Sequence, residues 1–149
     1  MSRRTVFISG HTDITPDQFV MYYTDQLANA IRDNCRFIMG NAPGADSMAL
    51  DALLRAGVPP ADITVYIFRP DKDFSIGYYQ SLCVQTNQDP KWKSFRDRDA
   101  QMTRDSDYDV YWLRSADECV ALYGEKYRVR VSGTEANIRR RAKESLLKL

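Results

Sequence analysis

Residues 36–49 combine the two features that most restrict the fold: a short apolar run, and a glycine turn that leads into a helical pattern. The apolar run predicts a buried strand, and Gly40 lets the backbone leave it without a Cβ in the way. Pro43 and Gly44 then form the turn. A helix that starts here presents free N–H groups and a partial positive charge, which is a natural seat for a phosphate. Similar junctions occur at residues 9–12 and 132–134.

Apolar runs alternate with helical patterns along the whole chain. The runs that predict strands are residues 5–9, 36–39, 63–68 and 109–113. The helical patterns cover residues 16–31 after Pro16, 48–56 before Gly57, 95–106 and 134–149. This order predicts an α/β fold in three layers, a Rossmann-like open and mainly parallel sheet with helices on both faces. At 149 residues, the chain is expected to form a single domain, 1–149.

Composition excludes several classes of protein. The net charge of +1 provides no basic field, so no nucleic-acid partner is expected. No apolar run approaches the roughly 20 residues of a membrane span. Cys35, Cys83 and Cys119 are odd in number and widely spaced, which favours a reducing compartment and a cytoplasmic protein. With a single histidine, no metal site is expected, and no cofactor is assigned.

Two segments read as insertions into this pattern. Residues 69–93 have no regular periodicity and predict a long loop. Residues 115–131 form the second insertion, and a hairpin or an extended excursion is predicted around Gly124. The first insertion is rich in aromatic side chains that could stack on a nucleobase: Phe74, Tyr78, Tyr79 and Trp92.

The three glycine junctions are expected to meet, because the carboxyl ends of parallel strands lie at one edge of a sheet. Arg98 and Met102 share a helix face, so Met102 can pack inward while Arg98 reaches over the strand ends. Asp46 or Ser47, and Ser132 or Thr134, either cap their helices or contact a ligand. The candidate ligand-binding residues are Gly10, His11, Gly40, Asn41, Gly44, Asp46, Ser47, Arg98, Ser132, Gly133, Thr134 and Asn137.

In this order the motifs resemble the SLOG superfamily, which includes Lonely-Guy phosphoribohydrolases, DprA-type DNA-processing proteins and the YspA/YpsA-like proteins. Residues 8–13 are similar to its opening strand and glycine loop, and residues 40–49 are similar to the Gly-x-Ala-x-Gly-Ala-Asp segment of the YspA-like branch. Residues 98–107 resemble the Arg-Lys-x-x-Met segment of the Lonely-Guy enzymes, and residues 132–134 resemble the final phosphate loop. The resemblance implies a nucleotide-binding domain that forms homo-oligomers.

Two functions follow from the resemblance. The first is binding of a nucleotide or a nucleotide derivative, with Arg98 as the cationic contact. The second is cleavage or exchange of an N-glycosidic bond, with Arg98 and Glu135 as catalytic residues, or Asp46 or Asp107 as the source of the carboxylate. The position of the family's catalytic glutamate holds Asn137, which cannot act as a general acid or base, so binding is the preferred hypothesis.

Overall fold

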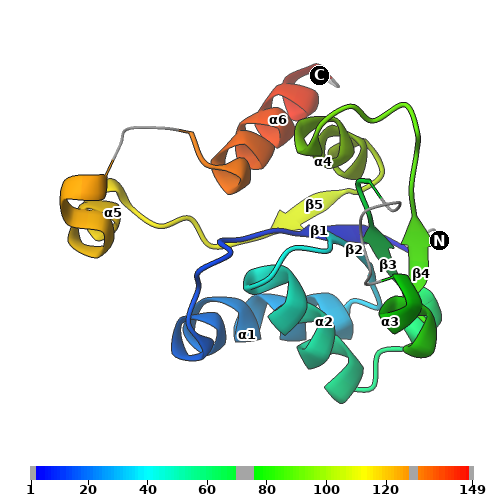
Figure 1. The fold of residues 1–149 in the computed structure, drawn as a ribbon. Coiled ribbons are helices and arrows are strands. Elements are labelled where there is room, and N and C mark those ends of the chain that lie inside the picture. The colour runs from blue at the N-terminus through cyan, green and yellow to red at the C-terminus, as the bar shows by residue number, and fades with distance from the viewer. Residues whose placement is uncertain (1–2, 70–75, 128–130, 148–149) are drawn as a thin grey trace.

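A five-stranded parallel sheet organises the computed structural model, which describes residues 3–69, 76–127 and 131–147. The strand order is β4-β3-β2-β1-β5, so the chain moves outward from β1 and then returns to its other side (Figure 1). Every pair of neighbouring strands is parallel. The strands are β1 (Thr5–Ile8), β2 (Arg36–Gly40), β3 (Ile63–Tyr66), β4 (Gln85–Asn87) and β5 (Tyr108–Val110).

Helices cover both faces of the sheet, so the predicted three-layer Rossmann-like fold is confirmed. One face carries α1 (Pro16–Arg32), α2 (Ala45–Arg55) and α3 (Ile76–Ser81), and the other carries α4 (Phe95–Arg104) and α6 (Gly133–Leu147). The helix α5 (Ala116–Tyr123) stands apart from the sheet (Figure 1). Two short 3-10 helices are η1 (Pro60–Asp62) and η3 (Gly124–Lys126). Within the described ranges, no helix combines the length and the apolar character that a bilayer span requires.

Alternating side chains of the strands build a core on each face of the sheet. In β1, Val6 and Ile8 join the larger core with α1 and α2, whereas Phe7 joins the smaller core with Ile38 and Met102. Strands that are apolar on both faces are typical of a parallel sheet. As predicted, Met102 packs inward from α4.

The predicted loop at residues 69–93 is wrong in part, because the segment contains α3 and the edge strand β4. Its aromatic side chains differ in exposure. Tyr79 and Trp92 are buried, and Trp92 stacks on Tyr66 with ring centroids 5.9 Å apart, so neither is free to receive a base. Tyr78 is exposed, and Phe74 lies outside the described residues.

Of the two alternatives predicted for residues 115–131, the hairpin is wrong: α5 and η3 occupy residues 116–126, and 128–130 lie outside the described residues. The strand expected at 109–113 is β5, which ends at Val110. Beyond it, side chains of α1 replace a neighbouring strand. The Tyr111 N–H donates to Gln26 at 3.3 Å, and the Trp112 N–H donates to the Tyr23 hydroxyl at 3.1 Å.

The helix α6 is held on the sheet by polar contacts. The apolar residues of the helical pattern at 134–149 are Ala136, Ile138, Ala142, Leu146 and Leu149, but the described part of α6 buries only Thr134 and Asn137. Ala142 and Leu146 are exposed, and Leu149 lies outside the described residues.

Arg141 supplies the main attachment of α6. Its guanidinium pairs with Asp109 of β5 at 3.2 Å and donates to the carbonyls of Thr103 and Ser106 at 3.0 and 2.9 Å. It also donates to the Ser106 hydroxyl. The Asp109 carboxylate is only 5% exposed, so this ion pair is buried on its acidic side.

Replacement of Arg141 by Met is expected to lower the free energy of unfolding by about 3 kcal/mol, because a buried carboxylate loses its partner. Urea denaturation followed by circular dichroism measures this loss. Arg139→Met is the matched control: Arg139 pairs with Glu135 at 3.4 Å but is 67% exposed, and the loss should stay below about 0.5 kcal/mol. Equal losses in the two variants would contradict the assigned role of Arg141.

Candidate functional site

One cavity of about 240 Å³ lies at the carboxyl ends of β1 and β2, beside the point where the strand order reverses. The three glycine junctions and Arg98, which are far apart in the sequence, all contribute to its walls. This is the edge at which ligands bind in open α/β sheets. The lining residues are Phe7, Ile8, Ser9, Gly10, His11, Thr12, Gly40, Ala42, Asp46, Arg98, Asp99, Met102, Ser132, Gly133, Thr134 and Asn137.

The first glycine junction, at residues 9–12, forms the first loop of the cavity wall. It depends on a close approach of α1 to Gly10. The Tyr23 hydroxyl donates to the Ser9 carbonyl at 2.6 Å, and a Cβ on Gly10 would lie 2.1 Å from that hydroxyl. The same Cβ would lie 2.5 Å from Ala45 Cβ at the start of α2. Gly10 therefore lets α1 and α2 pack directly against the floor of the cavity.

The second loop is fixed by its backbone. Gly44 has φ +79°, and its Cβ position is closed by the carbonyls of His11 and Thr12. Gly44 is also the N-cap of α2, and it offers no side chain, so the predicted capping by Asp46 or Ser47 is wrong. Asp46 instead accepts from the Ala42 N–H at 3.3 Å inside the loop, and the exposed Ser47 donates to the Gly44 carbonyl.

Arg98 lies over the strand ends, as predicted, with its guanidinium against Gly40. A Cβ at position 40 would lie 2.9 Å from Arg98 Cζ. Two of the guanidinium nitrogens donate to Asp99 Oδ1 at 2.9 and 3.1 Å, and the third donates to Asn41 Oδ1 at 3.2 Å. Most of the charge of Arg98 is therefore balanced by the protein itself.

Asp46 is a buried carboxyl in the wall of the same cavity, 9% exposed. Burial raises the pKa of Asp46 to about 7, and the proximity of Asp99 adds to the rise. The positive charge of Arg98 and the Ala42 N–H oppose this rise without cancelling it. Near neutral pH, Asp46 can therefore donate a proton or a hydrogen bond.

The third loop is the N-terminus of α6. Ser132 caps the helix, as predicted, because its hydroxyl accepts from the Glu135 N–H at 3.1 Å. The N–H groups of Gly133 and Thr134 precede the first intrahelical bonds and belong to residues that line the cavity. Asn137 is buried in the wall and accepts from Arg140 at 2.8 Å.

Ser9 was absent from the predicted site residues, although it ends the first apolar run. Its side chain is 7% exposed and lines the cavity. Across the described residues, Ser9 Oγ is the only buried side-chain nitrogen or oxygen that lacks a hydrogen-bond partner. A buried hydroxyl without a partner is destabilising, so Ser9 Oγ is open to a hydrogen bond from a group that reaches it.

His11 lines the cavity as a neutral ring. Its Nε2 accepts from the Arg114 N–H at 2.9 Å, which leaves the proton on Nδ1. Burial lowers the pKa of His11, and the charge of Arg114 lowers it further. The ring also packs edge-on against Trp112, with centroids 5.5 Å apart.

Several predicted residues lie outside the cavity wall. Asn41 orients Arg98, while Gly44 and Ser47 shape the second loop. Glu135 pairs with Arg139 along α6. Asp107 accepts from the Thr5 N–H at 2.7 Å, at the opposite end of the sheet. Asp99 lines the cavity but was not predicted; its position next to Arg98 was the available signal.

Comparisons with protein-family models, with curated proteins and with solved structures find no match. The chemistry of the cavity is therefore the basis for assigning a function.

The stability difference between the wild type and Asp46→Asn is expected to depend on pH. The folded pKa of Asp46, about 7, lies above the ordinary value of 3.8, so the folded state holds a proton that the unfolded state loses. Stabilisation of the wild type should therefore be largest below pH 4 and fall towards pH 7, by at most about 1.4 kcal/mol per pH unit. Urea denaturation at several pH values measures it. If the wild type instead gains stability over Asp46→Asn as the pH rises, the charge of Arg98 lowers the pKa of Asp46 more than burial raises it.

Proposed function

We propose that this chain is a nucleotide-binding domain of the SLOG type, which holds the phosphate of a nucleotide or nucleotide derivative at the N-terminus of α6. The observation that carries the proposal is the unpartnered hydroxyl of Ser9, a residue that lines the same cavity as Gly133 and Thr134. Backbone N–H groups and the helix dipole attract an anion, and a hydroxyl can donate to a phosphate oxygen.

The charges in the cavity favour the N-terminus of α6 over Arg98 as the phosphate site. Arg98 already donates to Asp99 and Asn41, and the carboxyl groups of Asp46 and Asp99 would repel a second anion when ionised. Carboxylates and amides suit the hydroxyl groups of a sugar. We therefore assign the phosphate to α6 and the sugar to the Arg98 side.

Cleavage of an N-glycosidic bond is the second candidate function, and one observation favours it: Asp46 is a carboxyl with a pKa of about 7 in the cavity wall. A carboxyl that is protonated near neutral pH suits a general acid. Of the three carboxyl groups named from the sequence, Asp46 remains the candidate acid, because Glu135 and Asp107 do not line the cavity.

Ser9→Ala is expected to act in opposite directions on stability and on binding. Without ligand, the variant should be more stable by about 1 kcal/mol, because a buried unpartnered hydroxyl is removed. Its affinity for phosphorylated ligands should fall about tenfold, because one hydrogen bond to a charged group is lost. Urea denaturation measures the first effect. Calorimetry with ribose 5-phosphate, AMP, ADP, NAD, ADP-ribose, deoxynucleotides and cyclic dinucleotides measures the second.

Ser47→Ala is the matched control, because Ser47 is exposed, donates to Gly44 and does not line the cavity. If the wild type binds none of the ligands in this panel, the proposed function is wrong. Chromatography of the same mixtures tests for free base. Base released by the wild type, and not by Asp46→Asn, would identify an enzyme.

We also propose that two copies associate through α5, in a reducing compartment where Cys35, Cys83 and Cys119 stay free. The eight-residue helix buries none of its side chains, whereas isolated helices this short are marginal in water. Its Val120 and Leu122 are 50% and 54% exposed, and a groove of about 560 Å³ is lined by Asp13, Leu122, Tyr123, Glu125 and Lys126.

Leu122→Glu is expected to convert a dimer into a monomer, because it places a charge on an apolar contact. Light scattering after size-exclusion chromatography measures the mass. Val20→Glu is the control, since Val20 is 62% exposed but lies on α1. A wild type that is monomeric at every concentration would rule this association out.

A further inference from the structure

Arg98 connects the cavity to an aromatic side chain outside it. One side of its guanidinium lies against Gly40, in the cavity wall. The guanidinium also lies over the ring of Phe95, with Cζ 5.0 Å from the ring centroid. Phe95 is the first residue of α4 and is 59% exposed. An open aromatic ring therefore stands directly behind the cation that borders the site.

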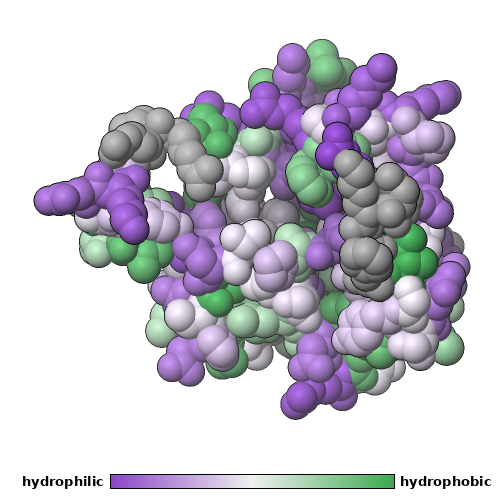
Figure 2. Space-filling model, viewed as in Figure 1, coloured by the Kyte–Doolittle hydropathy of each residue, from purple (hydrophilic) through white to green (hydrophobic). Residues whose placement is uncertain are grey.

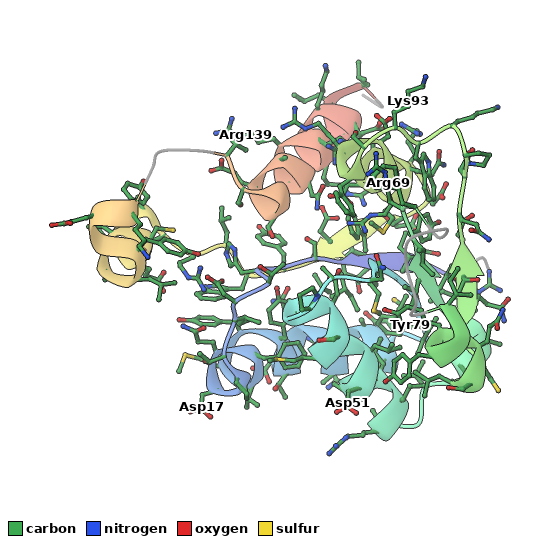
Figure 3. The ribbon with its side chains drawn as sticks, in the orientation of Figure 1. Asp17, Asp51, Arg69, Tyr79, Lys93 and Arg139 are labelled. Atoms are coloured by element: carbon green, nitrogen blue, oxygen red, sulfur yellow. The ribbon has the colours of Figure 1, made fainter. Side chains whose placement is uncertain are left out.

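Two more side chains extend this contact into a continuous series of four. Phe68 meets Phe95 edge-on, with centroids 4.9 Å apart and an interplanar angle of 72°. Arg69 Cζ lies 5.4 Å from the Phe68 centroid. We call the four side chains, Arg69, Phe68, Phe95 and Arg98, the arginine–aromatic ladder. Arg69 follows the end of β3 and lies beside α4 in Figure 3.

The ladder contains two locally unfavourable features. Arg69 has φ 59°, a left-handed conformation that non-glycine residues adopt rarely and that clusters at functional sites. Phe95 leaves most of its ring in water, whereas Trp92, three residues earlier, is buried in the core. Hydrophilic and hydrophobic residues are intermixed over the visible face in Figure 2. Packing of the fold explains the buried aromatics but not the open ring of Phe95.

We propose that the ladder is a stacking subsite for the nucleobase of the bound ligand, with the base on the open surface of the Phe95 ring. This inference rests on the proposed function, which places the sugar next to Arg98. The cavity of about 240 Å³ is smaller than the roughly 300–1,000 Å³ of a typical ligand site, so the base extends beyond its rim. Stacking on aromatic and guanidinium planes suits any base, because every base has a π-face.

The ligand class that follows is a nucleoside 5′-phosphate, recognised with little discrimination among bases. The ladder offers rings and guanidinium groups but no side-chain acceptor for the edge of a base. Purines should bind more tightly than pyrimidines, because their larger rings cover more of Phe95.

Calorimetry on Phe95→Leu tests the subsite, with ribose 5-phosphate and the nucleoside monophosphates AMP, GMP, CMP and UMP as probes. The variant should bind AMP and GMP about tenfold more weakly and ribose 5-phosphate within twofold of the wild type. Phe95→Trp should bind AMP at least as tightly as the wild type. Tyr78→Leu is the matched control, because Tyr78 is also 59% exposed but lies on α3. It should change no affinity.

Three other outcomes would contradict the stacking subsite, and the third would also contradict the proposed function. If Phe95→Leu binds AMP as tightly as the wild type, the stacking subsite is wrong and the phosphate site stands. If AMP and ribose 5-phosphate weaken equally, Phe95 only positions Arg98, and the subsite is again wrong. If the wild type binds none of the five probes, the proposed function fails, and the subsite fails with it. Circular dichroism of each variant confirms that it is folded.

Discussion

The contact between Arg141 and Asp109 holds α6 at the edge of the sheet that carries the cavity. The described part of α6 buries no apolar side chain, so the hydrophobic effect contributes little to its position. An ion pair with a buried carboxylate and three further hydrogen bonds fix it instead. Because α6 brings Ser132, Gly133 and Thr134 to the cavity, the geometry of the cavity depends on a contact made two helical turns away.

The cavity contains two kinds of positive charge, one from the backbone and one from a side chain. Its anion-attracting groups are N–H groups at a helix terminus, which carry only partial charge and need no counter-ion. Its full cation, Arg98, is paired with Asp99 and stands beside Asp46. A guanidinium balanced in this way is a rigid part of the wall, and the Phe95 ring can pack on it without competing for its hydrogen bonds.

The parts of the structure that local chemistry determines could be predicted from the sequence. Apolar runs gave β1, β2 and β3, Pro16 began α1, and Gly57 followed the end of α2. By contrast, β4 has the polar sequence Gln-Thr-Asn and pairs with β3 only in the folded chain, so no local pattern marks it.

The site shows the same division. Glycine junctions in the sequence located three walls of the cavity, and at Gly10 and Gly40 the structure leaves no room for a Cβ. The role of Arg141 among three consecutive arginines, and the lack of a partner for Ser9 Oγ, depend on tertiary contacts and were not predictable.

The two outer strands, β4 and β5, have a further consequence. Each is only three residues long, and β4 is polar and largely exposed. Edge strands this short offer little template for pairing with a strand of another chain.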